Sequence, residues 1–327
     1  MKKRPHYIKI IKAVLLVSML VLLWQYVKVI DPHQIRAALA KVGAGFGWVI
    51  LSTIVAYALG TLGWLYCFKD SRASIPKIDL FMIRHVCETV GLFNPASFAG
   101  GDMLKIVLLK PYSVSQPTVV TSVIISRLLM IVSQICLLLL AVIWFSLQGK
   151  MNPGVWLPGT SIVVIAIICL SLGLIIYKLL AFNWHAEKYP KLSRIRAEFA
   201  NVRSELIHFY RSSPKELALA FLFFTLHWVV GSLEFYIVLK LFGYDITILD
   251  GLLLDMGVIV VKAAGAFVPG QIGVEELGNK VMLSLVGISS IPLWLSVSAL
   301  RRTRQLIWVL IGAIFYSFFI YKKRIYS

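Results

Sequence analysis

The sequence predicts an all-α polytopic membrane protein, with about six full transmembrane helices and two broken or re-entrant helical hairpins in an inverted repeat. Three observations lead to this fold class. Of the 327 residues, 59% are hydrophobic and only 15% are charged, whereas about a quarter of the residues in a soluble domain are charged. Several windows run for about 20 residues with almost no charge, the length that crosses about 30 Å of hydrocarbon. Two further apolar segments are interrupted by proline, glycine and acidic residues, as in helices broken at membrane depth.

The formal net charge of +18 is explained more simply by the membrane than by nucleic acid. Membrane proteins keep basic residues in their cytoplasmic loops, where these residues meet anionic lipid. We therefore expect no nucleic-acid partner. The four cysteines lie in apolar segments without a CxxC spacing, so they indicate neither a disulfide framework nor a metal site. We expect no cofactor.

Six long apolar segments predict the full crossings. The first follows the basic stretch MKKRPHYIKIIK, which resembles a signal sequence in charge, but its apolar run is long and no small-x-small cleavage site follows. We therefore expect a retained first transmembrane helix. The predicted spans cover roughly 8–30, 45–67, 118–147, 156–180, 216–242 and 293–320.

Basic clusters orient these spans. Lysine and arginine residues precede the first span, follow the second, fill the 178–215 connection and end the chain, while the connections near 148–155 and 243–250 carry at most one base. The positive-inside rule then places both the N-terminus and the C-terminus in the cytoplasm. Within the long connection, the segment 183–213 repeats apolar residues at three- and four-residue steps. This pattern predicts an amphipathic helix on the cytoplasmic leaflet or, alternatively, a solvated linker helix.

Residues 79–110 and 250–290 predict hairpins and not ordinary spans. Each has an apolar arm of about 15–18 residues, a break that contains an acid, and a second arm, and such arms are short for a full crossing. The backbone groups freed at each break must be satisfied by protein or by a wet cavity. The predicted break residues are Asn94, Pro95, Gly100 and Gly101 in the first hairpin, and Pro269, Gly270 and Gly273 in the second.

The two hairpins share a register. In each, an acid follows the proline by seven residues and an arginine follows it by 32: Asp102 and Arg127 in the first, Glu276 and Arg301 in the second. The predicted topology runs the two units in opposite directions across the membrane. Inverted repeats with broken helices are typical of transporters, whose substrate site lies where the repeats meet near the bilayer midplane. We expect a single integral membrane domain, 1–327, whose repeats cover about 45–147 and about 216–320.

Charged side chains inside the apolar segments are the candidates for a site. A charge at the centre of a spanning helix costs about 2.5–3.5 kcal/mol on insertion scales, so it usually faces the protein interior or a partner. The natural pairs are Asp102 with Arg127, and the acids at 275–276 with the arginines at 301–304. They either fix each hairpin as structural ion pairs or line a polar cavity that passes a lipid headgroup, and one pair can do both. The candidate headgroup-binding residues are Asp102, Arg127, Glu275, Glu276, Arg301, Arg302 and Arg304.

The sequence contains no recognisable catalytic motif. It has no HExxH, no GxSxG and no Rossmann fingerprint, so we expect no enzymatic activity and no catalytic residue. His227 and Glu234 lie seven residues apart on one predicted span. A lone histidine in such a helix is more often packed and hydrogen-bonded than a metal ligand, so we predict no metal site.

Several stretches resemble a known family. The segments ETVGLFNPASFAGGDMLKIVLLK and SVIISRLLMIVSQ, and above all AFVPGQIGVEELGNKVMLSLVGIS followed by LSVSALRRTRQLIWVLIG, are similar to the flippase-like membrane family. This family includes the transmembrane region of lysylphosphatidylglycerol synthases, and the subfamily most similar to the chain is the hopanoid-biosynthesis-associated membrane protein. The resemblance implies a bacterial inner-membrane protein with paired re-entrant hairpins that moves or handles lipids. In the synthases a separate soluble domain transfers the aminoacyl group; the chain ends seven residues after its last predicted span, so we expect no synthase activity.

The expected function is lipid translocation or lipid handling in the bacterial cytoplasmic membrane, with a headgroup held between the two hairpins. The expected partners are membrane lipids, either phospholipid or another polar lipid. A homo-oligomer or a lipid-synthesis enzyme partner also fits the sequence. Two alternatives remain open: an accessory subunit that scaffolds a lipid- or glycolipid-modifying enzyme, and a membrane-embedded transferase.

Overall fold

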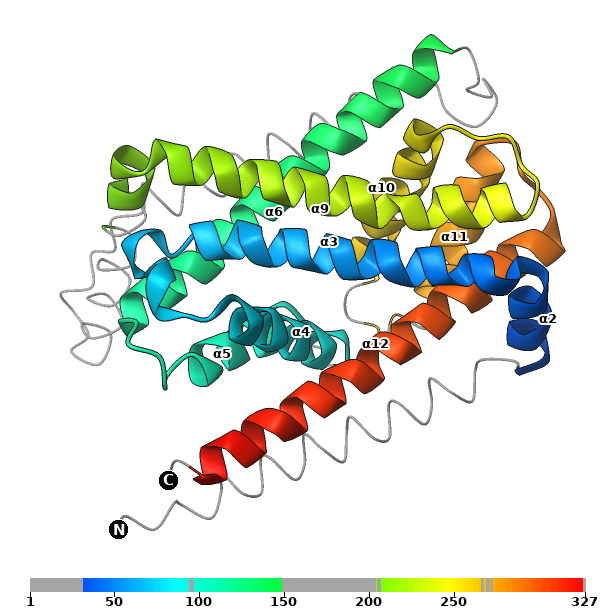
Figure 1. Cartoon of the computed structure of the whole chain (residues 1–327). Coiled ribbons are helices and arrows are strands. Elements are labelled where there is room, and N and C mark those ends of the chain that lie inside the picture. Colours follow the sequence, from blue (N-terminus) through cyan, green and yellow to red (C-terminus); the bar gives the residue numbers. More distant parts are fainter. Residues whose placement is uncertain are drawn as a thin grey trace, which may run out of the picture.

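The chain is an all-α membrane protein in its computed structural model (Figure 1). The predicted spans 8–30 and 156–180, and most of the amphipathic segment 183–213, lie outside the described residues, as do the break residues Asn94, Pro95, Pro269 and Gly270. The structure describes residues 32–93, 97–148, 204, 207–265, 268, 271 and 273–325.

The described helices form two units with the same order of elements. Each unit has a long helix, two short helices of 17 and 12 residues, and a second long helix of 32 or 35 residues. Helix α2 (Pro32–Val42) and the 3-10 turn η1 (Gly43–Gly45) precede the first unit. The first unit contains α3 (Phe46–Tyr66), the 3-10 turn η2 (Lys69–Ser74), α4 (Lys77–Phe93), α5 (Ser97–Leu108) and α6 (Gln116–Leu147); the second contains α9 (Pro214–Leu241), α10 (Ile248–Ala264), α11 (Val274–Leu285) and α12 (Ile291–Ile325).

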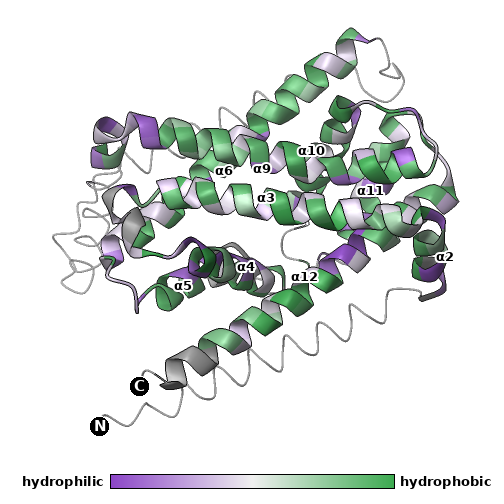
Figure 2. Ribbon diagram, in the orientation of Figure 1, coloured by the Kyte–Doolittle hydropathy of each residue, from purple (hydrophilic) through white to green (hydrophobic). Residues whose placement is uncertain are grey.

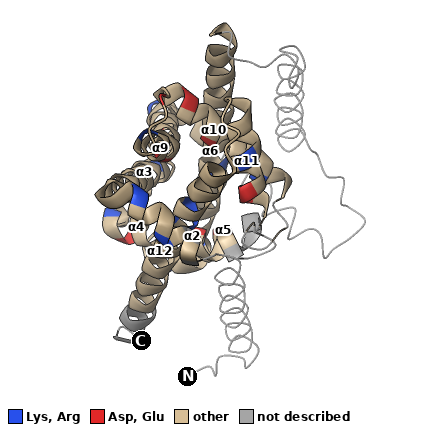
Figure 3. Ribbon diagram, turned by 90° about the vertical axis from the view of Figure 1, so that its right-hand side faces the viewer, with Lys and Arg blue, Asp and Glu red and all other residues tan. Residues whose placement is uncertain are grey.

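The two units run in opposite directions. In Figure 1, α3 runs from the right to the left and α9, which packs along it, runs from the left to the right. The same reversal relates α6 to α12. The view along α3 and α9 places these two helices together on one side and α6, α10 and α11 on the other (Figure 3).

Three segments of the described part are long and apolar enough to cross a membrane: Ile35–Tyr66, Gln116–Leu147 and Pro214–Leu241. At 1.5 Å per residue, the continuous helices Gln116–Leu147 and Pro214–Leu241, of 32 and 28 residues, are about 48 and 42 Å long, more than the hydrocarbon thickness. Within Ile35–Tyr66 the long helix is α3, whose 21 residues extend over about 32 Å. Only 22–28% of the residues in the most apolar windows of the three segments are buried, so most of these hydrophobic positions face outward (Figure 2). The predicted spans 45–67, 118–147 and 216–242 coincide with these segments, and 293–320 falls within α12.

A polar belt separates two hydrophobic clusters along the long helices. On α3, Val49 belongs to one cluster and Trp64 to the other, while Thr53, Ala56 and Tyr57 lie between them and line a cavity. The same order of cluster, cavity and cluster recurs along α6 and α9. The cavity therefore lies near the middle of the membrane-spanning segments.

The short helices start and pack through local features of the sequence. Helix α10 begins at a capping box, in which the Thr247 hydroxyl accepts from the Asp250 backbone N–H at 3.2 Å and the Thr247 N–H donates to the Asp250 carboxylate at 2.8 Å. Helix α5 packs closely on α4 because Gly101 lies against the backbone carbonyl of Cys87, which a Cβ at this position would approach to 2.5 Å. Only a glycine allows this approach of the two arms. Gly100 and Gly101 therefore lie inside α5 and not at the break, contrary to the prediction from the sequence.

Candidate functional site

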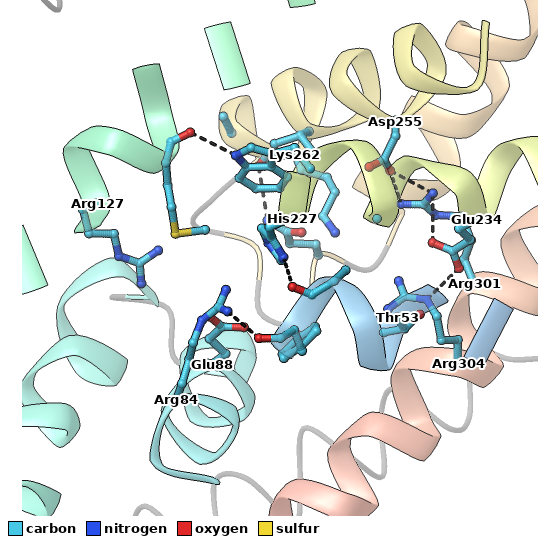
Figure 4. Close-up of a pocket in the computed structure, with 18 residues that line it drawn as sticks. Thr53, Arg84, Glu88, Arg127, His227, Glu234, Asp255, Lys262, Arg301 and Arg304 are labelled. Carbon is cyan, nitrogen blue, oxygen red and sulfur yellow. Dashed lines mark hydrogen bonds and ion pairs between the residues drawn. The ribbon is translucent and has the colours of Figure 1, made fainter. Parts of the chain in front are cut away.

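A cavity of about 370 Å³ lies between the two units (Figure 4). Its walls come from α3, α4 and α6 of the first unit and from α9, α10 and α12 of the second, together with Gln271 between α10 and α11. Five lining residues are basic and three are acidic, which gives a formal net charge of +2 with His227 neutral. The charged lining residues are Arg84, Arg127, Lys262, Arg301, Arg304, Glu88, Glu234 and Asp255.

Arg301 is the centre of an ion-pair network in the second unit. Both of its terminal nitrogens donate to Oδ1 of Asp255 at 3.0 Å, and its Nε donates to Oε1 of Glu275 at 3.1 Å. Its Nη1 also lies 3.3 Å from Oε2 of Glu234. The three carboxylates belong to α10, α11 and α9, so this side chain, which is 4% exposed, ties the four helices of the unit together.

Arg302 and Arg304 extend this network. Arg302 binds Glu276 in a bidentate manner, from Nε at 2.6 Å and from Nη2 at 2.9 Å, and its Nη2 also donates to the Gln271 carbonyl at 3.0 Å. Arg304 donates from Nε to Oε1 of Glu234 at 2.6 Å. The bidentate pair connects α12 to the first turn of α11, where the helix leaves the break.

Glu275 is held by three different donors. Besides Arg301, the Gln305 amide donates to its Oε2 at 2.7 Å and the Lys262 ammonium lies 3.3 Å from the same oxygen. The carboxylate is 2% exposed, whereas the Lys262 side chain is 20% exposed and lines the cavity. The Lys262 ammonium therefore has further N–H donors beside the cavity, in addition to the one that bonds Glu275.

The backbone of the second break explains the place of Glu276. Gly273 has a φ of 82°, a left-handed conformation that glycine adopts without a steric penalty. Helix α11 starts after it, and the Gly273 N–H donates to Oε2 of Glu276 at 2.9 Å. An acid in the first turn also suits the positive end of the helix dipole. Glu276 thus caps its own helix while it binds Arg302.

The first unit has a smaller network. Asp102 of α5 accepts from Nε of Arg127 at 2.8 Å and from Nη2 of Arg127 at 3.1 Å, and it also accepts from Lys105 at 2.9 Å. The Arg127 side chain is 35% exposed, and it lines the cavity from α6. This pair joins the second arm of the hairpin to the following long helix, as Glu276 and Arg302 do in the second unit.

Arg84 has a buried terminal nitrogen without a hydrogen-bond partner among the described residues. It donates from Nε to Glu88 at 2.7 Å and from Nη1 to the Tyr57 carbonyl at 3.0 Å. The terminal nitrogen without a partner is Nη2. The guanidinium lies against Gly60 of α3, where a Cβ would overlap it. The lack of a side chain at Gly60 therefore leaves the space that the arginine occupies.

The charges balance differently in the two networks. The second-unit network contains four basic side chains, Lys262 and the three arginines of α12, and four acidic ones. The first-unit network contains Arg84, Lys105 and Arg127 against only two acids. Removal of charges from water is costly unless partners compensate for it. The second unit is fully compensated, and the first has one uncompensated positive charge.

The structure brings the predicted site residues together within each unit. The expected pairs are present: Asp102 with Arg127, Glu275 with Arg301 and Glu276 with Arg302. Three of the predicted residues line the cavity, and the other four act as their ion-pair partners or neighbours and are not lining residues. Those that line it are Arg127, Arg301 and Arg304; those that do not are Asp102, Glu275, Glu276 and Arg302.

Sequence reasoning missed several members of the site. Glu234, Asp255 and Arg84 all line the cavity, and each is a charge inside an apolar segment, which is the signal that identified the other candidates. His227 is packed as expected: its Nδ1 donates to the Ala56 carbonyl at 2.6 Å.

Comparison with known proteins identifies the family of this chain. The model of the lysylphosphatidylglycerol synthase transmembrane region matches residues 10–319, which include the first unit, the second unit up to residue 319 and the whole cavity lining. Neither a curated protein nor a solved structure matches the chain. The nearer relation to the hopanoid-associated subfamily stays a prediction. The match extends over nearly the full length, so this chain belongs to the lysylphosphatidylglycerol synthase transmembrane region family.

Proposed function

We propose that this protein moves polar lipids between the leaflets of the bacterial cytoplasmic membrane, with the headgroup in the cavity between the two units. The observation that carries the proposal is the position of the charges. A charged cavity lies at mid-length of the spanning helices, between units that run in opposite directions. The family to which the chain belongs adds a lipid-related context.

The physical reason is the cost of a headgroup in hydrocarbon. A charged group at the bilayer centre loses its hydration, and a path across the membrane must replace the lost water with polar partners. Arginine and carboxylate side chains in the cavity can supply these partners. The acyl chains need no such path, because the outward faces of α3, α6 and α9 expose apolar side chains such as Trp48, Leu140 and Leu222.

The arrangement of the short helices suggests how access could alternate. The pair α4–α5 lies toward one end of the long helices and the pair α10–α11 toward the other (Figure 1). Rocking of one unit against the other would open the cavity to one membrane face at a time, as in transporters built from inverted repeats. In this scheme the ion pairs within each unit stay intact while the contacts between the units change.

Reconstituted protein tests the proposal. Proteoliposomes would carry tail-labelled fluorescent lipids, and a quencher that reaches only the outer leaflet would measure transbilayer movement. We expect the wild-type protein to raise the quenched fraction over time and Arg127→Gln to slow the process. Lys240→Gln is the matched control, because Lys240 lies at the end of α9 in an exposed pair with Asp245 and not in the cavity.

The opposite result would favour another role. If the wild-type protein moves no lipid of any headgroup, the translocation proposal fails. Recovery of a lipid- or glycolipid-modifying enzyme with the purified chain would then support the accessory role.

We also propose that both termini face the cytoplasm. One end of the described helices contains η2, the connection from α5 to α6, the start of α9 and the end of α12 (Figure 1). These segments contain Lys69, Arg72, Lys110, Arg211, Lys215, Lys322, Lys323 and Arg324. At the opposite end, α2 contributes Arg36 and Lys41, and the turn from α9 to α10 has no basic residue between 243 and 250. The positive-inside rule supports the basic end as cytoplasmic.

A further inference from the structure

The two units meet at two contacts that occupy equivalent places in the inverted arrangement. Helix α4 of the first unit packs on α12 of the second, and α10 of the second unit packs on α6 of the first. The contacts correspond because α4 and α10 hold the same position in the order of elements, as α6 and α12 do. The α4–α12 contact lies toward one end of the long helices and the α6–α10 contact toward the other (Figure 1). If the two contacts open in turn, each opens the cavity toward a different membrane face.

The two contacts differ in chemistry. Leu137 and Ala141 of α6 and Leu254 of α10 belong to one hydrophobic cluster, and neither helix contains a histidine. In the α4–α12 contact, His85 is 1% exposed, and its Nε2 donates to the Trp308 carbonyl at 2.8 Å. Nε2 carries the proton of this bond, because a carbonyl oxygen can only accept. The α4–α12 contact therefore contains a group whose charge can change near neutral pH.

The surroundings of His85 suit a neutral imidazole. Four aromatic rings from three helices surround it, with centroid separations of 5.0–6.3 Å: Tyr57, Phe81, Trp308 and Phe315. Its Nδ1 is buried and has no hydrogen-bond partner among the described residues. A proton on Nδ1 would need an acceptor, and the neighbouring indole of Trp308 is a donor only. In the closed contact, a protonated His85 thus has an unsatisfied N–H.

The ionisable groups around His85 do not compensate a positive charge there. Arg84 and Glu88, on the same helix, bind each other at 2.7 Å, so their charges cancel. From α3, the phenol of Tyr57 is uncharged near neutral pH, and from α12, Arg304 is itself a cation. The faces of the aromatic rings attract a cation, but this attraction is weak beside the hydration that a buried charge loses. A protonated His85 is therefore more stable when the α4–α12 contact is open to water.

We propose that His85 is a proton-binding site that controls the α4–α12 contact. The neutral imidazole bonds Trp308 and keeps the contact closed, and protonation opens the cavity toward the membrane face at that end. Protons can reach the site through the cavity, because Tyr57 packs against His85 and lines the cavity beside Glu88. The inference rests on the proposed function, to which it adds a proton-driven step, and it makes no assumption about the headgroup.

Distances between paired spin labels test this step without lipid transport. The labels are placed on exposed residues of the purified full-length chain in lipid nanodiscs, after its four native cysteines are replaced by serine. Ile78→Cys on α4 with Phe318→Cys on α12 reports the α4–α12 contact, and Leu147→Cys on α6 with Ile248→Cys on α10 is the control pair. Pulsed electron paramagnetic resonance measures both distances at about pH 8 and about pH 5.5, which bracket the ordinary titration of histidine.

We expect the Ile78–Phe318 pair to show one short distance at about pH 8 and a second, longer population at about pH 5.5. The conversion should run over about two pH units, as for a single titrating group, and the control pair should not lengthen. His85→Gln should keep the short distance at both pH values, because its amide can still donate to Trp308 and does not titrate. His227→Gln is the matched control. His227 is the other buried histidine among the described residues, and it lines the cavity, where water can hydrate its charge, so this variant should keep the wild-type response.

Three results would overturn the inference. They are a wild-type distance that does not change with pH, a response that persists in His85→Gln, and an equal lengthening of both labelled pairs. The proton site and the translocation proposal fail separately. A chain that shows the His85-dependent response but moves no lipid keeps the proton site and loses translocation. A chain that moves lipid without any response of the distance to pH keeps translocation and loses the proton site.

Discussion

Arg301 illustrates how single residues organise this membrane interior. A guanidinium has five N–H donors in a rigid plane, and Arg301 divides them among carboxylates from three helices. The sequence predicts that acids and arginines in apolar segments pair, because an isolated charge there is costly. It does not predict which acid meets which arginine, since Glu275 and Glu276 are neighbours in sequence and only the rotation of α11 sends one to Arg301 and the other to Arg302.

Removal of the Arg301 guanidinium should destabilise the second unit. Arg301→Gln leaves Asp255 and Glu275 buried without their main partner, and breaking a buried ion pair in this way costs about 3–5 kcal/mol. Thermal unfolding of the purified protein in detergent should show a lower melting temperature. Lys240→Gln should leave it unchanged, because an exposed ion pair contributes little to stability. An Arg301→Gln protein that melts with the wild type would show that the network is not structurally important.

The contact between Gly60 and Arg84 gives a second test at this scale. Gly60→Ala places a Cβ into the Arg84 guanidinium, so the arginine must move and its bonds to Glu88 and Tyr57 must weaken. Gly47→Ala is the matched control on the same helix, because nothing lies within 4 Å of a Cβ at that position. Alanine in a helix is favoured over glycine by about 0.5–1 kcal/mol, so Gly47→Ala should hold or raise the melting temperature while Gly60→Ala lowers it. Equal effects of the two substitutions would contradict this packing.

At the scale of elements, the short helices are the features that the sequence indicates most directly. Arms too short to cross, joined through proline and glycine, predict broken helices, and the structure has pairs of 17- and 12-residue helices at both places. The sequence does not reveal that the first arms, α4 and α10, line the cavity while α5 and α11 supply no lining residue. This division depends on tertiary packing, which the local pattern of polar and apolar residues does not encode.

Cross-links between elements test whether the units move against each other. A Cβ at Gly312 of α12 would lie 3.0 Å from Cβ of Thr89 on α4, and a Cβ at Gly278 of α11 would lie 3.4 Å from Cβ of Val261 on α10. Both separations are slightly below the usual Cβ–Cβ spacing of a disulfide, about 3.5–4.5 Å. The double variants Thr89→Cys/Gly312→Cys and Val261→Cys/Gly278→Cys would be made in a chain whose native cysteines are replaced by serine: Cys67, Cys87, Cys136 and Cys169.

We expect the two cross-links to act differently on lipid movement. The first joins the units, so its oxidation should stop transbilayer movement and a reductant should restore it. The second lies within one unit and is the matched control, so its oxidation should leave the rate unchanged. If the cross-link between the units has no effect while it is fully formed, the units do not rock against each other.

At the scale of the whole molecule, the cavity lies where the two units, which have the same order of elements, meet. Two units of similar helix lengths run in opposite directions, and their polar residues meet at mid-length of α3, α6 and α9. The spacing of proline, acid and arginine indicates the repeat from sequence alone. The cavity itself could not be inferred in this way, because its lining comes from six helices whose relative rotation is set by packing.

Because the two units run in opposite directions, we predict that their connections are exposed on opposite sides of the membrane. The connection from α5 to α6 and the turn from α9 to α10 lie at opposite ends of the long helices (Figure 1), and each contains an exposed residue, Ser113 and Asp245. In the cysteine-free chain, Ser113→Cys should react with a membrane-impermeant thiol reagent only after the membrane is opened. Asp245→Cys should react in intact cells, because the basic segments hold the other end in the cytoplasm. Protection of both sites, or labelling of both in intact cells, would place the two connections on one side and exclude the inverted arrangement in the membrane.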